Sequence, residues 1–442
     1  MAINIFTLGC KVNQYESGRL GSALRRRGFS VAYGLIPPAE LYVLNTCAVT
    51  AEAERKSRQA VARIRRAAPD AKIIVYGCAS QNCREAFIGK PGVAGVYGTE
   101  DVVIVAEEIA KKLGIRSEAL GVKDGEQYLK TVYGEGRARA YIKAQDGCDS
   151  FCSYCIVPHL KGRSRSRPIS DITAEAERLS GQYKEIVLIG INLSDYGKQM
   201  KNDKGQMTNP HSTLHTPQAL TDLITALADI PARIRLGSLE CQVITRPFLQ
   251  SLQNLKAFCP HFHLSLQSGS DKILRAMNRH YTAAEYLDKV KLIRFFFPNA
   301  GITTDIICGF PGETDEDFEM TCRTAEAAAF SDIHIFPYSE REGTAAAKSS
   351  EPCIPKALIL ERVKILSEIR GRSRSMFLRN LTNGSGNDMI VLLERTAGGI
   401  SEGYSENYIR CYCKEPLRVG EQYRVRAAGV WKDGLEVVTL KA

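Results

Sequence analysis

The chain has 442 residues, of which 44% are hydrophobic, and it carries a formal net charge of +10 at pH 7. A chain of this length exceeds one typical core, so we expect two or three domains, and its apolar runs are too short to span a membrane. The basic excess permits a polyanionic partner such as RNA, and it fits a solvated basic surface equally well.

Fourteen cysteines are spread along the chain. The first residues, MAINIFTLGC, lack the basic region and long apolar block of an export signal. We therefore expect a cytoplasmic protein without a membrane association, in which reduced thiols serve as metal ligands instead of forming disulfides.

Residues 1–113 alternate strand-like and helix-like segments. The runs INIFTLG and LYVLNT are each followed by a helical pattern, and KIIVYG is the third strand-like run of the series. This alternation predicts a small parallel α/β sheet. Residues 114–137 are polar and rich in glycine, so they are predicted to be a linker.

Residues 138–370 repeat a strand-then-helix pattern. Six strand-like runs, AYIKAQ, EIVLIGIN, RIRLGSLE, HFHLSLQSG, ITTDIICGF and DIHIFPYS, predict an incomplete (β/α)6 barrel. The polar stretch 196–216 interrupts this series and is expected to be an exposed loop insertion. In residues 371–442, a basic helical segment precedes short β-type runs, which predict a small all-β barrel of the OB-like kind.

The sharpest motif is GCDSFCSYCIVP, in which Cys148, Cys152 and Cys155 have the spacing CxxxCxxC. Three thiolates on one loop can hold three irons of a 4Fe-4S cubane and leave the fourth iron open for chemistry. The alternatives are buried structural thiols or a zinc knuckle, for which His159 would supply a fourth ligand. The spacing, the neighbouring Tyr154 and the barrel pattern that follows favour the cluster.

Three further cysteines end consecutive predicted strands of the first domain. Cys10 ends NIFTLGC, Cys47 ends LYVLNTC and Cys78 ends KIIVYGC. Neighbouring strands lie about 4.8 Å apart and ligands bind outside their carboxyl ends, so the three thiols can converge on one cubane. This geometry predicts a second three-ligand cluster, although buried cysteines are common and Cys83 could compete with Cys78.

The cysteine loop resembles that of the radical S-adenosylmethionine (SAM) superfamily. The stretch ITTDIICGFPGET is similar to the superfamily's glycine-rich SAM-contacting segment, and HFHLSLQSGSDKIL to the strand that approaches the ribose and substrate. Two three-cysteine sets, an α/β domain, a radical SAM barrel and a terminal β barrel together resemble the methylthiotransferase family. That resemblance implies that residues 1–113 carry an auxiliary cluster and that residues 371–442 form the RNA-binding module called TRAM.

Within this family, LGCKVNQYES, SLQSGSDKILRAMNRHY and PYSEREGTAAA are close to the branch that modifies threonylcarbamoyladenosine beside the tRNA anticodon. Relatives that act on isopentenyladenosine typically read GCQMN at the first cysteine, and those that act on a ribosomal-protein aspartate read GCPKN. The resemblance implies a methylthio group placed on carbon 2 of adenosine 37, two SAM molecules per turnover and an external one-electron donor of the flavodoxin or ferredoxin kind. One alternative is an enzyme of the same family that acts on isopentenyladenosine in tRNA or on a ribosomal-protein aspartate. Another is a non-catalytic iron-sulfur protein that binds RNA.

The resemblance also suggests individual roles. No catalytic group beyond the cluster cysteines is assigned, while SAM and substrate contacts are expected from polar residues at or near strand ends, with buried hydrogen-bonding roles as the alternative: Asn192, Ser238, Glu240, Gln267 and Asp305. Phosphate contacts are expected from the helix bearing Arg55 to Arg66, from KGRSRSRP and from the connector bearing Arg370, Arg372 and Arg374. Cys241 and Cys308 depart from the family's usual residues, and neither removes a cluster ligand.

Overall fold

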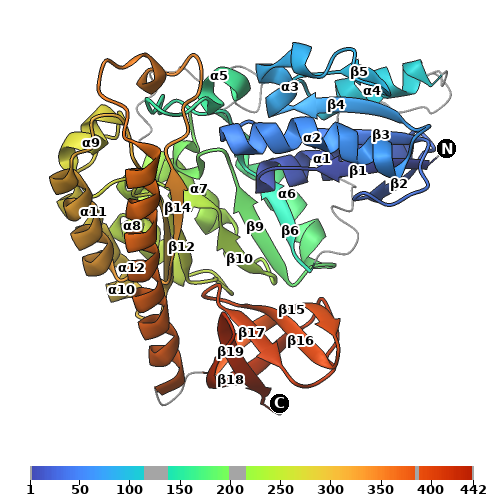
Figure 1. The fold of residues 1–442 in the computed structure, drawn as a ribbon. Coiled ribbons are helices and arrows are strands. Elements are labelled where there is room, and N and C mark those ends of the chain that lie inside the picture. Colours follow the sequence, from blue (N-terminus) through green and yellow to red (C-terminus); the bar gives the residue numbers. More distant parts are fainter. Residues whose placement is uncertain (1, 114–137, 199–215, 384–387, 441–442) are drawn as a thin grey trace. The chain divides into compact units, whose positions relative to one another are not determined.

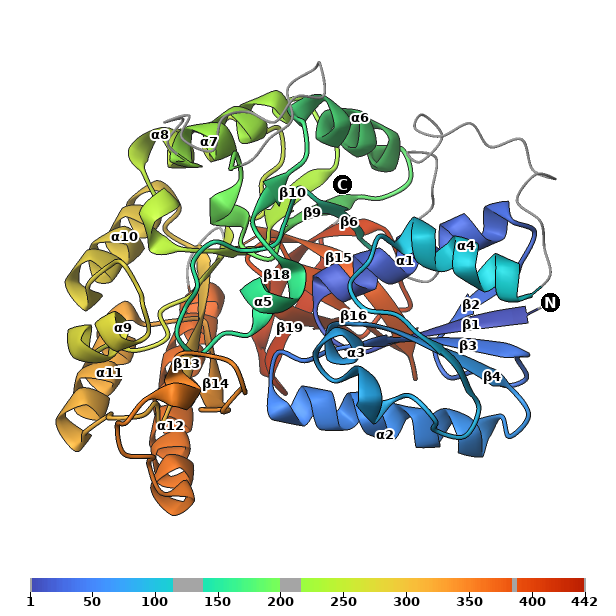
Figure 2. The ribbon, with the colours of Figure 1, turned by 90° about the horizontal axis from the view of Figure 1, so that it is seen from above.

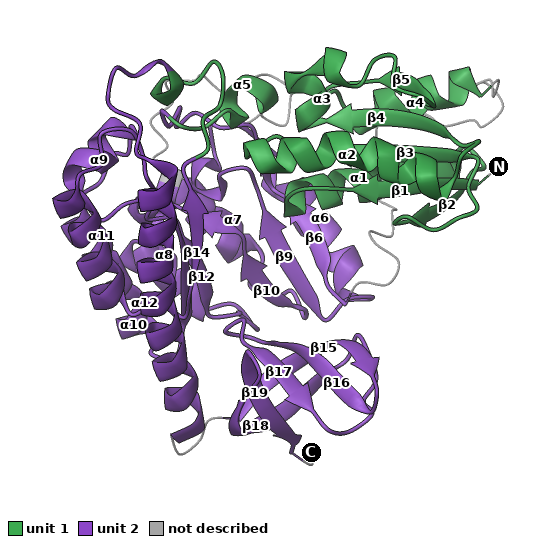
Figure 3. Ribbon diagram, in the orientation of Figure 1, with its two compact units in different colours: residues 1–135, 154–163, 339–347 green, residues 136–153, 164–338, 348–442 purple. Residues whose placement is uncertain are grey.

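A computed structural model describes residues 2–113, 138–198, 216–383 and 388–440 (Figure 1). These residues belong to two compact units, which Figure 3 shows in two colours. Unit 1 comprises residues 1–135, 154–163 and 339–347, and unit 2 comprises residues 136–153, 164–338 and 348–442. The predicted linker, 114–137, lies outside the described residues, as does most of the predicted loop insertion at 196–216.

Unit 1 contains a five-stranded parallel sheet in the order β2-β1-β3-β4-β5, which confirms the predicted α/β sheet. Two of its strands, β2 and β5, were not predicted, because each has only four residues and their runs SVAY and VAGV give a weak pattern. The strands are β1 (Ala2–Thr7), β2 (Ser30–Tyr33), β3 (Leu41–Thr46), β4 (Lys72–Gly77) and β5 (Val93–Val96).

Helices cover both faces of this sheet, so its central strands are buried on both sides and read as continuous apolar runs. One core joins α1 and α4 to Ile3, Ile5 and Val43, and the other joins α2 to Tyr42 and Leu44. Figure 2 shows α1 and α4 on one side of the sheet and α2 on the other. The helices of the unit are α1 (Lys11–Arg26), α2 (Ala51–Ala67), α3 (Cys78–Asn82), η1 (Arg84–Ala86), α4 (Val102–Lys112) and α5 (Val157–Lys161).

Unit 2 contains the partial barrel that the sequence predicts. Its parallel strands form two sheets in the orders β10-β9-β6 and β11-β12-β13-β14, and only Gly237 separates β10 from β11. The strands are β6 (Ala140–Lys143), β9 (Glu185–Ile189), β10 (Arg233–Leu236), β11 (Ser238–Leu239), β12 (His261–Leu264), β13 (Gly301–Cys308) and β14 (Asp332–Pro337), with the small pair β7 (Gln145–Asp146) and β8 (Arg165–Ser166) beside them.

Helices follow the barrel strands in chain order, as the alternating pattern requires. Among the described residues, no helix is both long enough and apolar enough to cross a membrane. The helical elements are α6 (Ile169–Ser180), η4 (Leu193–Asp195), α7 (Thr216–Ala226), η5 (Cys241–Val243), α8 (Arg246–Gln253), α9 (Asp271–Ala276), α10 (Ala283–Phe296), α11 (Asp315–Ala328), η6 (Ala346–Lys348) and α12 (Lys356–Asn383).

The last strands of unit 2 close into a five-stranded barrel in the order β15-β16-β17-β19-β18, which confirms the predicted OB-like domain. Cys411 and Cys413 point into its core beside Val425 and Leu435, so both thiols are packing residues. The prediction missed β16, whose glycine, glutamate and serines hide its alternation. The strands are β15 (Asp388–Ala397), β16 (Ile400–Ser405), β17 (Arg410–Cys413), β18 (Gln422–Trp431) and β19 (Gly434–Thr439).

A buried ionic network joins the partial barrel to this terminal barrel within unit 2. Glu185 is fully buried and accepts hydrogen bonds from Arg233 (2.6 Å) and Arg235 (2.8 Å). The same guanidinium groups donate to backbone carbonyls of the terminal barrel, at Ile390 (2.7 Å) and Ser405 (3.1 Å). Although burial opposes ionisation, the charges of the neighbouring arginines hold the pKa of Glu185 far below its usual value. The carboxylate therefore offsets part of the desolvation cost of burying both guanidinium groups.

This network predicts that Glu185→Leu destabilises the terminal barrel. Removing one partner of a buried ion pair costs about 3–5 kcal/mol, because the remaining charges stay buried without compensation. Trp431, the single tryptophan of the chain, lies on β18 and reports this barrel by its fluorescence during urea unfolding. Glu421→Gln is the matched control, since the exposed Lys184–Glu421 pair (3.9 Å) spans the same two parts and should contribute less than about 1 kcal/mol. Equal losses in both variants would contradict the role given to Glu185.

Candidate functional site

The three cysteines of unit 1 lie at neighbouring carboxyl ends of its sheet. Cys47 directly follows β3 and Cys78 directly follows β4, while Cys10 lies three residues beyond the end of β1 and precedes α1. The strands are adjacent and in register, with Thr7 opposite Asn45 and Thr46 opposite Gly77. A Cβ atom on Gly9, the residue before Cys10, would lie only 3.1 Å from Sγ of Cys47, so the first two of these strand ends approach closely. The structure thus brings the predicted residues together, while their role as iron ligands stays a prediction.

Two glycines at this edge allow the backbone to turn before a cysteine. Gly9 has φ +108° and Gly77 has φ +107°, a region that side chains rarely adopt. A Cβ atom on Gly9 would lie 2.9 Å from the Cβ atom of Cys47, and one on Gly77 would lie 2.6 Å from Oδ1 of Asn45. The GC pairs of the sequence are therefore needed for the close approach of the strand ends.

A buried amide network lies directly beneath the thiols. Asn13 accepts a hydrogen bond from the Cys10 thiol (3.2 Å) and donates to Oδ1 of Asn45 (3.0 Å) and to the carbonyl of Thr46 (2.9 Å). The amide nitrogen of Asn45 contacts the hydroxyl of Tyr76 on β4 (2.9 Å). Asn13, the last residue of GCKVN, thus fixes the loop that carries Cys10 to the neighbouring strand.

Burial favours the protonated form of the two buried thiols, Cys47 and Cys78. It raises the pKa of Cys47 above its usual value and raises that of Cys78 to about 12. A metal centre at this edge would therefore have to displace thiol protons when it binds. Lys161 and Glu16 form a buried ion pair nearby, with Nζ 2.7 Å from Oε1. The charge of Lys161 lowers the pKa of Cys78, and the charge of Glu16 raises it. The sequence analysis did not identify this pair, because its members are 145 residues apart.

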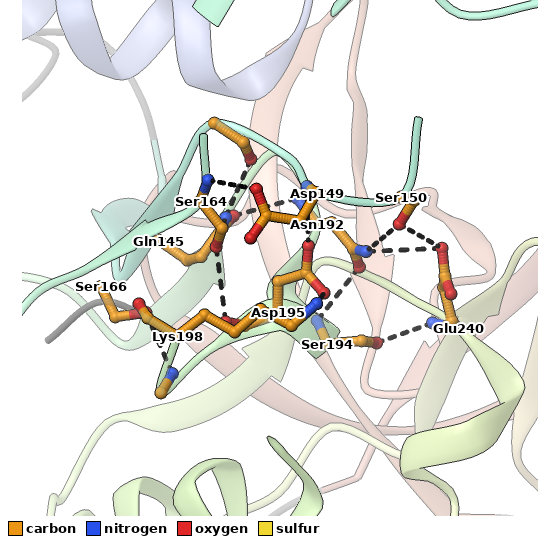
Figure 4. A network of polar contacts seen from close by, with 12 residues as sticks. Gln145, Asp149, Ser150, Ser164, Ser166, Asn192, Ser194, Asp195, Lys198 and Glu240 are labelled. Atoms are coloured by element: carbon orange, nitrogen blue, oxygen red, sulfur yellow. Dashed lines mark hydrogen bonds and ion pairs between the residues drawn. The ribbon is translucent and has the colours of Figure 1, made fainter. Parts of the chain in front are cut away.

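The CxxxCxxC loop is held in place by hydrogen bonds to the barrel. Cys148 and Cys152 belong to unit 2, and Cys155 belongs to the short segment 154–163 of unit 1. The backbone amide of Asp149 donates to Asp195 (3.2 Å), and the carboxylate of Asp149 accepts from the amide of Ser164 (3.1 Å), as Figure 4 shows. These bonds fix the first half of the loop against the ends of the first two barrel strands.

Arg279 is a candidate site residue that no sequence motif indicates. Its guanidinium Nη1 lies 3.3 Å from Sγ of Cys152 and 3.0 Å from Oε1 of Glu240. The guanidinium therefore joins the second cysteine of the loop to a carboxylate that follows β11. The available signal was the position of Arg279 in the stretch SLQSGSDKILRAMNRHY, which resembles a family segment but has no recognisable spacing to a cysteine.

Three of the five expected SAM and substrate contacts follow strands of unit 2, and the other two lie within strands. Asn192, Glu240 and Gln267 come after β9, β11 and β12, whereas Ser238 begins β11 and Asp305 lies in the middle of β13. The Asn192 amide donates to Ser150 of the cysteine loop (3.3 Å) and to Glu240 (3.4 Å), so these two lie beside the loop (Figure 4). Ser238 is exposed on β11, and Asp305 accepts from the ring of His263 (3.1 Å). Gln267 has φ +69° and joins β12 to β13 through its backbone, which donates to the carbonyl of Asp305 (2.8 Å). Their predicted roles stay predictions.

The expected phosphate contacts are largely paired with acids. Arg55 donates to Glu52 through Nε (2.7 Å) and Nη2 (2.6 Å). Arg370 and Arg374 both pair with Asp332. An arginine held by a carboxylate has less capacity to attract a phosphate, so the connector is a weaker candidate than its sequence suggests.

Comparison with known proteins gives matches along most of the chain. Residues 142–325 match the radical SAM superfamily, and residues 2–98 match the uncharacterized protein family UPF0004. Threonylcarbamoyladenosine tRNA methylthiotransferase MtaB of Thermotoga maritima is 34% identical over 98% of this chain and 96% of its own length. The tRNA-2-methylthio-N(6)-dimethylallyladenosine synthase of Anaeromyxobacter dehalogenans is 36% identical, over 78% of this chain and 72% of its own length.

A solved structure supports the fold. The radical S-adenosylmethionine methyltransferase TsrM of Kitasatospora setae aligns with a TM-score of 0.53 at 17% identity, over 76% of this chain and 72% of that one. At this identity the likeness concerns the fold alone. The cysteine loop and the strand-end residues described above lie within the matched superfamily segment.

Gly9→Ala should destabilise unit 1 more than Gly28→Ala. Both glycines have positive φ, but a Cβ atom has nothing within 4 Å at Gly28, whereas at Gly9 it would push Cys47 away. Overpacking adds about 1–3 kcal/mol to the shared backbone cost. Hydrogen exchange of the β1, β3 and β4 amides measures the difference in opening free energy. Equal losses in the two variants would mean that the strand ends at Gly9 are not closely packed.

Proposed function

The chain belongs to the radical SAM methylthiotransferase family, and from this premise we propose that it adds a methylthio group to carbon 2 of threonylcarbamoyladenosine 37 in tRNA. The relatives that carry this name match along nearly their whole length, whereas the dimethylallyladenosine synthase matches over 72% of its length. Near-complete coverage supports the same domain set as well as the same chemistry.

The observation that carries the proposal is the presence of two sets of three cysteines, each in a setting that suits an open cluster. Cys148, Cys152 and Cys155 would hold the cluster that binds SAM, and Cys10, Cys47 and Cys78 would hold the auxiliary cluster. Both sets fit, because thiolates are the ligands that iron-sulfur clusters require. Cys148, Cys152 and Cys155 lie on one loop that follows β6 and β7, and Cys10, Cys47 and Cys78 follow three neighbouring strands. When bound, the clusters and SAM supply the one-electron chemistry and the sulfur that an unactivated ring carbon requires.

The chain's own residues position this chemistry. Arg279 places a positive charge beside Cys152 and binds Glu240, so the carboxylate is oriented and partly neutralised. Asn192 contacts both Ser150 and Glu240, which leaves a polar rim at the cysteine loop that can bind the charged end of SAM. An external one-electron donor of the flavodoxin or ferredoxin kind would supply the electrons, and the terminal OB-like barrel would bind tRNA.

The two cysteine sets should have separable effects on replacement by alanine. Cys148→Ala, Cys152→Ala or Cys155→Ala should abolish formation of 5′-deoxyadenosine from SAM under anaerobic reduction. Cys10→Ala, Cys47→Ala or Cys78→Ala should lose about half of the reconstituted iron, as one of two similar cubanes, and stop methylthio transfer while SAM cleavage continues.

Cys83→Ala is the matched control, since Cys83 is close to Cys78 in the chain but follows α3 instead of a strand. It should keep its full iron content. A Cys47→Ala protein with full iron would reject the auxiliary cluster, and a wild-type protein that forms no 5′-deoxyadenosine would favour a non-catalytic RNA-binding protein.

The substrate is tested directly with the reconstituted enzyme. Wild type should convert tRNA bearing threonylcarbamoyladenosine to its methylthio derivative, as measured by mass spectrometry of digested nucleosides. The control is tRNA bearing isopentenyladenosine, which should remain unchanged. Conversion of the isopentenyl substrate alone would replace the proposed activity by that of the dimethylallyladenosine synthases.

A further inference from the structure

A row of polar side chains crosses the inner face of the partial barrel. The strand register places Ser238 beside His263, His263 beside Thr303, and Asp305 beside His334. Thr304, between Thr303 and Asp305, contacts Tyr286 of the outer helix α10 (3.4 Å). Since successive side chains of a strand point to opposite faces, Thr303 and Asp305 point away from that helix and into the barrel.

Hydrogen bonds link neighbouring side chains of this row. The ring of His263 binds Thr303 through Nδ1 (3.0 Å) and Asp305 through Nε2 (3.1 Å), and Thr303 also binds Nε2 of His261 (3.1 Å). Asp305 can only accept when ionised, so the His263 Nε2–H donates to it. His263 is therefore a positioning residue that fixes the carboxylate of Asp305 on the inner face.

His334 is the exposed end of the row. It lies on β14, and the ligand atoms of His263, Asp305 and His334 all lie within 4.8 Å of one another. Partial desolvation and the neighbouring His263 lower the pKa of His334, and a neutral imidazole offers one donor and one acceptor. Asp305 and His334 together form a patch that can both accept and donate hydrogen bonds.

An aromatic ring lies beside this patch on the side of the strand carboxyl ends. Phe336 is two residues after His334, on the same face of β14, and its side chain is 41% exposed. An exposed phenyl ring next to hydrogen-bonding groups suits a purine, which stacks by its face and is read at its edge.

The row continues to the cysteine loop. Glu240 lies two residues after Ser238, and it binds Arg279, which contacts Cys152. Strands are spaced by about 4.8 Å, so β13 and β14 lie about 10–15 Å from β11, a distance that leaves room for SAM between the loop and the patch.

We propose that Asp305 and His334 recognise the N6 substituent of the substrate nucleoside while Phe336 stacks on its purine ring. This inference rests on the proposed function. The threonylcarbamoyl group has a carboxylate, a hydroxyl and a urea, which offer both donors and acceptors, whereas an isopentenyl group is a hydrocarbon. An isopentenyl group would bury the carboxylate and the imidazole without hydrogen-bond partners. The free-energy cost of these unpaired polar groups disfavours the isopentenyl substrate more strongly than a poor fit of shape would.

The test measures binding and turnover with anticodon stem-loop RNAs that carry threonylcarbamoyladenosine, isopentenyladenosine or unmodified adenosine at position 37. Holoenzyme with His334→Leu should lose about ten-fold or more of the preference for the threonylcarbamoyl RNA over unmodified RNA, since a polar group of the substrate is then buried without a partner. His334→Gln keeps a donor and an acceptor and should retain most of that preference. Phe336→Leu should weaken all three RNAs alike.

The control variant is Phe295→Leu, which changes an exposed aromatic residue of the outer helix α10 and should leave binding unchanged. A wild-type preference that survives His334→Leu overturns the inference while leaving the proposed function intact. A wild-type enzyme that does not modify threonylcarbamoyl RNA rejects both. Stoichiometric zinc in the wild type that is lost in His334→Leu would make the three ligands a metal site and would also overturn the inference.

Discussion

The chemistry of this chain depends on one constraint, the alignment of the carboxyl ends of parallel strands. In unit 1 the register of β1, β3 and β4 brings three cysteines from distant parts of the chain to one edge of the sheet. In unit 2 the same principle brings Asn192 and Glu240 to positions just after the barrel strands β9 and β11. Each strand supplies one side chain, so neighbouring strands can supply a set of ligands without any local motif.

Positive-φ glycines and buried amides hold these edges in place. Gly9 and Gly77 allow the chain to turn where a Cβ atom would collide with Cys47 or Asn45, and Asn13 bonds the first loop to the second strand. Burial favours the protonated form of Cys47 and Cys78, so the free energy of metal binding must include the loss of their protons. The backbone of this edge is preorganised, whereas the protonation of its thiols would change when a metal binds.

Much of this architecture can be predicted from the sequence, because long apolar runs ending in a cysteine or a polar residue are visible signals. The short strands β2 and β5 and the irregular β16 give weak patterns, so they were missed. Contacts between distant charges were also missed, among them Arg279 with Cys152 and Lys161 with Glu16. No periodicity encodes such pairs, since tertiary folding alone brings them together. The pairing of Arg370 and Arg374 with Asp332 likewise shows that a basic run does not reveal how much of its charge is compensated.

From the sequence alone, the choice of substrate rests on resemblance to a family branch. The inner face of the barrel adds a physical criterion, which is whether its polar side chains find hydrogen-bond partners on the substrate. A hydrophobic pocket discriminates weakly against a ligand that adds polar groups, but a hydrogen-bonding site strongly rejects a ligand that lacks them. On the proposed recognition, Asp305, held by His263, and the imidazole of His334 would be a site of the second kind. A polar N6 substituent satisfies these groups, and a hydrocarbon substituent would desolvate them without compensation. On the proposed recognition, substrate choice would depend on a few strand residues of the inner face, and the cysteines would supply the chemistry that every substrate shares.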